Sequence, residues 1–228
     1  MTDTPPDLGA PAETVYQLRL VIAGISPLIW RRLEVPADTT IAGLHAIIQT
    51  VFGWSGEHLH QFVIAGTEYG ICYDGGPWFR DDARKVHLAG LGLRERERFS
   101  YEYNFFAPWC AGLRVEQITG AQAGRVYPRC TGGRRAGPPE YWGGPWEYLE
   151  RTQPYRVSGA LVRAAEIMRA LLEAKDGDDL DAVDVDRDEL FALLPLLGLE
   201  RFDRRACNRS LRALGPHAVA SLIEGSRR

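Results

Sequence analysis

The sequence predicts an α+β protein in which a mixed or antiparallel sheet packs with a helix in a roll-like arrangement, followed by a mainly helical C-terminal half. Strand-like alternation of apolar and polar residues dominates the first half of the chain, and helical periodicity dominates the second. The two patterns do not alternate along the chain, as they would in a doubly wound α/β protein. We therefore expect a disordered leader at 1–13, an α+β core domain at 14–155 and a helical region at 156–228 packed on that core.

The first predicted unit is a β-hairpin followed by a helix. Residues 15–22 (VYQLRLVI) and 28–35 (LIWRRLEV) both favour strands, and the segment between them carries turn residues. Apolar positions at helical spacing predict a helix over 41–52. The Asp and Thr side chains at 38–40 can cap its start, and Gly53 can end it.

Further strands are predicted at 58–65, 98–105 and 112–118, with residues 106–111 joining the last two as a second hairpin. The segment 127–145 is rich in Gly, Pro and Arg, which is typical of a long ordered or semi-ordered loop.

The remaining periodic segments predict helices. A short helix is expected at 146–152, and Ser158 is a candidate N-cap for an amphipathic helix at 160–174. Its inward residues are expected to be Leu161, Ala164, Ile167, Met168 and Leu171. An acidic stretch at 176–189 leads to more helix, which Pro195 should break or kink.

Composition places the protein among ordinary globular proteins, with 45% hydrophobic and 25% charged residues. No apolar stretch is long enough to span a membrane, and residues 1–13 lack the basic and apolar regions of a signal peptide. We therefore expect a cytoplasmic protein without a membrane partner. The 4 cysteines lie singly and form no CxxC motif, so we expect free thiols, no disulfide partner and no zinc ribbon.

Charge is unevenly distributed along the chain. The net charge of the whole chain is −3. From residue 201 onward, however, the chain contains seven arginines and only two acidic residues, Asp203 and Glu224. Arg205, Arg209 and Arg212 are spaced to share one helical face. These cations would either contact an anionic partner or pair with the acidic stretch at 176–189, and both interpretations stay open.

Two Arg-rich segments are candidate binding elements. Arg31 and Arg32 lie on a predicted strand and point to opposite faces, so each would bind carboxylate or phosphate separately, or pair with Glu34, Glu102 or Glu116. The segment 127–145 combines cations with aromatic rings, a composition found in single-stranded nucleic acid binding. The alternative is an ordered loop whose aromatic rings pack on the sheet. No phosphate-binding glycine motif is present.

Weak metal candidates are His58 and His60, which would share one face of a strand. A third ligand would have to be supplied by Glu57, Cys130 or His45. The alternative is that one imidazole forms hydrogen bonds in a polar pocket while the other lies at the surface.

Residues 24–62 (GISPLIWRRLEVPADTTIAGLHAIIQTVFGWSGEHLHQF) closely resemble the signature of the Ri-plasmid ORF-three-like family. Members are also labelled insertion-element passenger proteins of the TnpR type. Weaker similarity continues at YEYNF (101–105), at LRVE (113–116) and its preceding Trp109, at PPE (138–140), and at FDRRACNRSL (202–211). The resemblance implies an α+β roll-like fold and a mobile-element association, without an established activity.

The chain departs from the family pattern at two places. The family motif Y-D-F-G-D-D-W with a following His reads YNFFAPW at 103–109, with Ala111 at the His position. Of a Cys-rich loop only Cys130 remains, because Gly137 and Trp142 occupy the other two thiol positions. Any chemistry that depended on those acids, that His and those thiols has been largely removed here.

The sequence therefore predicts a plasmid- or transposon-associated accessory protein that is not an enzyme and binds an anionic partner, nucleic acid or another protein. The alternatives are a metal-dependent or hydrolytic enzyme centred on His58 and His60, and a protein–protein scaffold. We expect no cofactor and assign no catalytic residue. The candidate binding residues are Arg31, Arg32, Asn104, Trp109, Arg129, Arg134, Arg135, Glu140 and Trp142.

Overall fold

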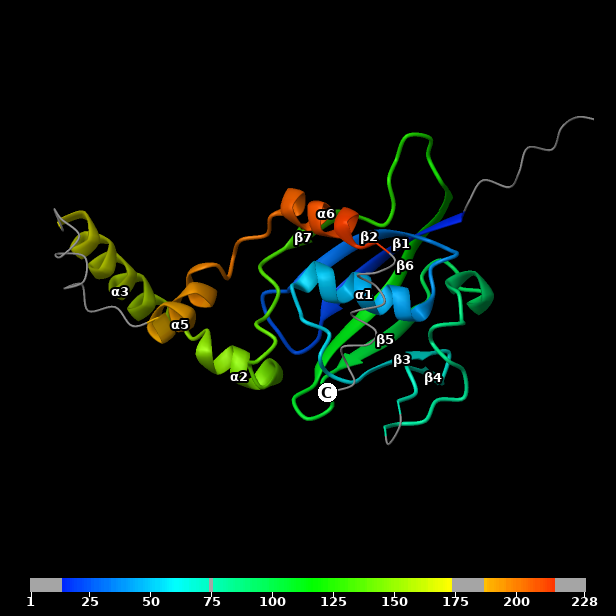
Figure 1. The fold of residues 1–228 in the computed structure, drawn as a ribbon, viewed down its shortest axis with the longest axis horizontal. Coiled ribbons are helices and arrows are strands. Elements are labelled where there is room, and N and C mark those ends of the chain that lie inside the picture. The colour runs from blue at the N-terminus through cyan, green and yellow to red at the C-terminus, as the bar shows by residue number, and fades with distance from the viewer. Residues whose placement is uncertain (1–13, 74–75, 174–186, 216–228) are drawn as a thin grey trace, which may run out of the picture.

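The computed structural model describes residues 14–73, 76–173 and 187–215. Its centre is a seven-stranded sheet in the order β4-β3-β5-β6-β1-β2-β7, with antiparallel pairing throughout (Figure 1). The predicted α+β class is thereby confirmed. The strands are β1 (Thr14–Ile22), β2 (Trp30–Pro36), β3 (His60–Ile64), β4 (Thr67–Tyr69), β5 (Arg98–Tyr103), β6 (Trp109–Gly120) and β7 (Arg129–Arg134).

Helix α1 covers one face of this sheet (Figure 1). It spans Ile41–Phe52, as predicted, because both ends carry local stop signals. Thr40 accepts a hydrogen bond from the Gly43 amide at 3.0 Å, and Gly53 takes the left-handed conformation that ends a helix. The other helical elements are η1 (Leu88–Leu91), α2 (Gly144–Arg151), α3 (Pro154–Glu173), α5 (Arg187–Leu197) and α6 (Arg204–Ala213).

The predicted hairpins are present and place alternate residues on the two faces of the sheet. Leu18 and Leu20 on β1 and Leu33 on β2 are fully buried beneath α1, whereas the residues between them point to the opposite face. The second hairpin, β5 with β6, adds Tyr101 and Leu113 to the same core. One face of the sheet is therefore apolar and covered, and the other is polar.

The segment 127–145 is not a continuous loop, because β7 occupies its first part and pairs with β2. The glycines at 132 and 133 suggested a loop, but they serve close packing at the sheet edge. A Cβ added at Gly132 would lie 3.3 Å from the Trp30 ring, and one at Gly133 would lie 2.5 Å from the Phe202 ring.

The helices after the sheet differ from the prediction in two ways. Helix α3 begins at Pro154, so Ser158 lies inside it and is not its N-cap. Of its predicted inward residues, Ile167 is buried, whereas Leu161 and Met168 are more than half exposed. In Figure 1, α3 and α5 project away from the sheet. This position agrees with the exposure of those apolar side chains.

Helix α6 returns to the body of the protein and packs against β7 and α1. Pro195 lies within α5, and Arg205, Arg209 and Arg212 are exposed on α6. The predicted leader at 1–13 and most of the acidic stretch at 176–189 lie outside the described residues, so pairing between that stretch and α6 stays a prediction. Within the described ranges, no helix has both the length and the hydropathy of a membrane span.

Candidate functional site

The candidate binding residues do not share one cleft. Some lie inside the protein, some at a polar junction beside the C-terminal end of α1, and Arg32 and Arg129 on the uncovered face of the sheet. Arg32 and three further arginines on that uncovered face form the strongest candidate site.

Arg31 is a core residue and is 2% exposed. Its guanidinium donates to the carbonyls of Val51 at 3.1 Å, Trp30 at 2.8 Å and Arg134 at 3.1 Å. Its Cζ lies 5.1 Å from the Phe52 ring centre and 4.1 Å from that of Phe202. Burial lowers the pKa of Arg31 to about 10, so it remains a cation at neutral pH. These contacts give Arg31 a structural role.

Arg135 and Arg129 have internal partners as well. Arg135 is buried, donates to the Pro27 carbonyl at 2.8 Å and lies 2.7 Å from a carboxylate oxygen of Glu200. Arg129 lies on β7 with its Nε 3.6 Å from a carboxylate oxygen of Glu34. Arg134, at the end of β7, remains exposed.

Glu140 is the centre of a polar junction that holds the segment after β7 against the segment after α1. Its carboxylate accepts from the Ser55 amide at 2.6 Å, from the Ser55 hydroxyl at 2.8 Å and from the Tyr103 hydroxyl. The Trp109 indole donates to the Glu140 carbonyl at 3.3 Å. Burial and this carboxylate raise the pKa of Tyr103, so its phenol stays protonated. The geometry is that of a structural clamp, because no imidazole in the described part of the chain bonds to the Ser55 hydroxyl to act as a base.

The remaining candidates at this corner are also internal. Trp109 and Trp142 are buried, and Trp142 packs on Tyr148 with ring centres 5.5 Å apart. Asn104 takes a left-handed conformation, with φ of 62°, in the turn after β5, and its backbone N–H donates to the Leu59 carbonyl at 2.9 Å. These residues shape the corner and leave little side-chain surface for a ligand.

Gly137 explains why a thiol at that position would not fit this chain. A Cβ at 137 would lie 2.0 Å from the Phe52 carbonyl oxygen, which is backbone and cannot rotate away. We expect Gly137→Ala to lower the free energy of unfolding by roughly 1–3 kcal/mol or more, measured by urea denaturation. Gly112→Ala is the control, since a Cβ there meets no atom within 4 Å. Equal urea midpoints for the two variants would contradict this assignment.

His60 does not face solvent beside His58. Its ring stacks on that of His45, with centres 3.5 Å apart and planes 9° from parallel, and both histidines are fully buried. Burial lowers the pKa of both, that of His60 to about 3, so the pair is neutral. The His58 ring lies instead at the edge of Tyr103, with centres 5.6 Å apart.

The three weak metal candidates are separated. His60 lies under α1, His58 precedes β3, and Cys130 is buried on β7 at the far side of the sheet. Within the described part of the chain, no three His, Cys, Asp or Glu side chains are placed to hold one metal ion. The geometry therefore offers no support for the enzyme alternative centred on His58 and His60.

The uncovered face of the sheet carries a row of arginines, one on each of four neighbouring strands. Arg98 on β5 is directly opposite Arg114 on β6, which is opposite Arg19 on β1, which is opposite Arg32 on β2. We call these four residues the arginine row. Neighbouring strands are about 4.8 Å apart, so the row spans roughly 14 Å.

Arg32 is the neutralised member of the row. It forms two hydrogen bonds with the Glu116 carboxylate, at 2.5 and 3.2 Å. Arg19 lies over the Trp30 ring, 5.0 Å from its centre, and its Nε has no hydrogen-bond partner within the described residues. In that same part of the chain, neither Arg98 nor Arg114 forms an ion pair.

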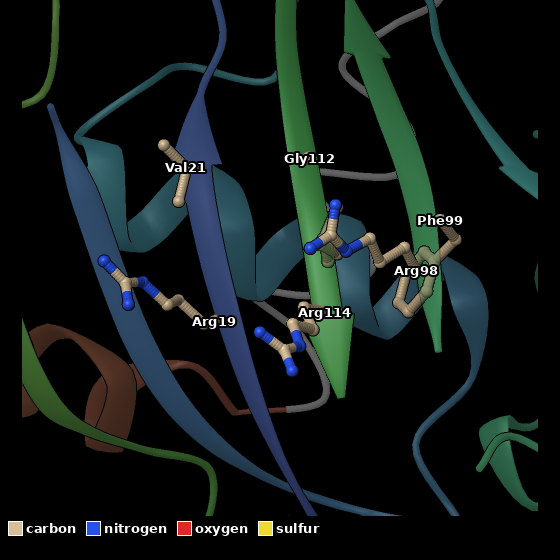
Figure 2. Close-up of a pocket in the computed structure, with 7 residues that line it drawn as sticks. Arg19, Val21, Arg98, Phe99, Gly112 and Arg114 are labelled. Carbon is tan, nitrogen blue, oxygen red and sulfur yellow. The ribbon is translucent and has the colours of Figure 1, made fainter. Parts of the chain in front are cut away.

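An open hollow of about 320 Å³ lies beside three members of the row. Figure 2 shows Arg19, Arg98 and Arg114 on the same side of the sheet, with α1 behind it. Gly112 forms part of the floor, and the absence of a side chain there leaves the space above β6 free. Like charges directly opposite one another destabilise a sheet, so this arrangement favours an anion that would neutralise them.

Arg19, Arg98 and Arg114 were not among the residues singled out from the sequence. Each is an ordinary polar residue of an alternating strand, and the row exists only through the pairing of strands that are distant along the chain. One part of the arginine row could have been recognised from the sequence. Arg98 and Arg114 both point outward on two strands that were correctly predicted to form a hairpin. The position of β1 between β6 and β2 could not be read from either hairpin.

Comparison with known proteins shows that this chain is similar to one protein family, to a relative in sequence and to a solved structure. The profile of the family described as plasmid pRiA4b ORF-3-like protein matches residues 14–187. The uncharacterized protein y4hQ of Sinorhizobium fredii is 29% identical over 141 residues, which cover 60% of this chain and 71% of that protein. The crystal structure of a protein of unknown function, MM3350 from Methanosarcina mazei Go1, superposes with a TM-score of 0.58 at 31% identity, covering 85% of this chain and 96% of the other.

Proposed function

Since the chain belongs to the plasmid pRiA4b ORF-3-like family, we propose that this member is a binding module that holds a single-stranded nucleic acid on the uncovered face of its sheet. The observation that carries the proposal is the arginine row, in which like charges lie directly opposite one another on four strands. Three of these four guanidiniums have no carboxylate partner among the described residues.

The dimensions of the row favour an extended anion over a single small one. A span of roughly 14 Å exceeds the size of one phosphate group and suits several consecutive phosphates. Arginine binds phosphate through paired N–H groups, and the half-exposed Trp30 beside the row supplies an aromatic edge for a base. A flexible single strand can follow the twist of the sheet.

Nearby acids do not cancel the row. The Glu116 carboxylate is held by Arg32 and by Gln17, and that of Glu102 accepts from Gln61 at 2.8 Å. The net charge of the whole chain, −3, therefore does not describe this face. The attraction between the arginine row and a nucleic acid would therefore be local to this face and sensitive to salt concentration.

We expect binding of a labelled single-stranded oligonucleotide, followed by fluorescence anisotropy, to weaken steeply with salt. With three or four phosphates contacted, the slope of log K against log salt should be about −2 to −3. Arg98→Gln/Arg114→Gln should weaken binding about tenfold or more at low salt and make the slope shallower by about 1.4.

Two controls separate the arginine row from general charge. Arg205→Gln/Arg209→Gln removes the same charge from α6 and should leave binding nearly unchanged. Gly112→Leu fills the hollow without altering charge, and the free space at Gly112 indicates that the fold will accept it; this variant should weaken binding. No binding at 50 mM salt, or equal losses from the two arginine pairs, would refute the proposal.

A further inference from the structure

A helical arm formed by α3 and α5 carries more than half of the exposed large apolar residues that the structure describes. The two helices pack against one another and project away from the sheet (Figure 1). Arg163 on α3 joins them through two hydrogen bonds to the Glu189 carboxylate on α5, at 2.7 and 3.0 Å. The helical arm is therefore a structural unit with an uncovered apolar surface.

The exposed apolar residues follow one face on each helix. Six of them, which we call the apolar stripe, are Leu161, Met168 and Leu172 on α3 and Leu190, Leu194 and Leu197 on α5. Their spacing is i, i+7 and i+11 on α3 and i, i+4 and i+7 on α5, so each set of three falls on one side of its helix. Met168 and Leu172 are the most exposed of the three on α3, at 59% and 80%.

The apolar stripe is separate from the buried face of α3. The buried residues of this helix, Ala160 and Ile167, lie about a third of a turn around the axis from Leu161. Ala165 lies within the stripe between Leu161 and Met168, and its small side chain would allow another helix to approach closely. The apolar stripe therefore remains available for packing against further helices.

The apolar stripe is large enough for a stable protein interface. A fully exposed side chain of the size of Leu presents apolar surface on the order of 100 Å². The exposed fractions of the stripe residues and of the flanking Val162 and Leu171 then correspond to about 450 Å² of apolar surface. Each partner in a stable interface buries roughly 800 Å², of which a little more than half is apolar. The stripe therefore supplies the apolar share of one partner.

The charge of the helical arm favours a partner with the same surface. The charged residues of the two helices are Arg156, Arg163, Arg169 and Arg187, with Glu166, Glu173, Asp188 and Glu189. The positive and negative charges are equal in number, so two copies that meet through the arm would not repel one another. An acidic or a basic partner would gain no attraction from the arm, in contrast to the arginine row.

We propose that the helical arm is a dimerisation element, in which the apolar stripe of one copy packs against the same stripe of a second copy. A two-fold axis brings identical surfaces together, so such a contact is closed and stops at the dimer. The three- and four-residue spacing of the stripe suits helices that cross at a shallow angle, as in a four-helix bundle. Two helices from each copy would form that bundle.

The test is sedimentation equilibrium of the full chain without nucleic acid, at concentrations up to about 50 μM, above the micromolar dissociation constants of the weakest interfaces of this size. We expect a mass twice that of one chain. Leu161→Gln/Met168→Gln should raise the dissociation constant about tenfold or more. Trp78→Gln/Val126→Gln removes two exposed apolar side chains outside the arm and should leave the dissociation constant unchanged.

Three outcomes would overturn the proposal. A wild-type mass of one chain at about 50 μM would do so, in favour of cover by the chain's own residues 216–228 or by a different protein. The others are a dimer that the stripe variant leaves intact, and a dimer that both variants weaken equally. All four substituted side chains are exposed, so both variants should keep the urea midpoint of the wild-type monomer. Since no nucleic acid is present, the result is independent of the proposed function.

Discussion

Arg31→Ala is expected to lower the free energy of unfolding by roughly 3–5 kcal/mol. Three carbonyls lose their guanidinium donor at about 1 kcal/mol each or more, and a cavity opens between Phe52 and Phe202. One of those carbonyls, that of Val51, is in the last turn of α1, which has no basic residue of its own. Arg31 therefore supplies, from β2, the cation that stabilises the C-terminal end of the helix.

The neighbouring arginine is a matched control for this prediction. Arg32 points to the opposite face, its side chain is 36% exposed, and its carboxylate partner is Glu116. Arg32→Ala should cost no more than about 1 kcal/mol, because exposed ion pairs contribute little. Urea denaturation of both variants is the measurement. Similar losses for the two would show that Arg31 is not the structural cation described above.

Acid should destabilise the protein at a pH well above the usual range for carboxylates, through His45 and His60. Both folded-state pKa values lie below the unfolded value of about 6.5, so the unfolded chain binds two more protons below that pH. The contribution of the two neutral histidines to the free energy of unfolding is therefore fully present above about pH 6.5. It decreases as the pH falls, and for His60 the decrease continues down to about pH 3. The loss should be about 2.7 kcal/mol per pH unit for the pair, or about 4 kcal/mol at pH 5.

The hydrogen bonds around His45 explain why no neighbour rescues its charged form. Gln49 donates to the Tyr101 hydroxyl at 2.7 Å, so the phenol proton points to His45 Nδ1, 2.9 Å away. The neutral ring then carries its proton on Nε2. A protonated His45 would need to donate from Nδ1 as well, which displaces the Tyr101 proton.

Free energies of unfolding from urea denaturation between pH 5.0 and 6.5 test this account. His45→Phe/His60→Phe keeps two stacked rings that cannot be protonated, and its stability should be nearly constant across the window. A wild-type protein whose stability is equally constant would contradict the assignment of a neutral buried pair.

The parts of the fold that could be predicted depend on local signals. Helix α1 was predicted to the residue because Thr40 and Gly53 act within one turn of its ends. Strand β7 was missed because Gly132 and Gly133 are typical of loops, and the rings that pack over them come from β2 and from the segment before α6. The exposed apolar residues of α3 were expected to be inward because helical spacing does not reveal what the helix packs against.

The candidate site was harder to predict for a physical reason. The Trp30-Arg31-Arg32 segment was identified, and its alternation correctly placed the two arginines on opposite faces. Which of them is buried depends on α1, and which arginines join Arg32 depends on the position of β1 between β6 and β2. Strand order and register are properties of the assembled sheet, so the arginine row could not be recognised from any one segment.

The most direct test of the proposed function is an NMR titration of the labelled full-length protein with a single-stranded oligonucleotide at 50 mM salt. We expect the largest chemical-shift changes at the Nε–H groups of Arg19, Arg98 and Arg114 and at the Gly112 amide, with the Arg205 and Arg209 signals unmoved. Changes confined to α6, or a spectrum that does not change, would contradict a nucleic-acid surface on this face of the sheet.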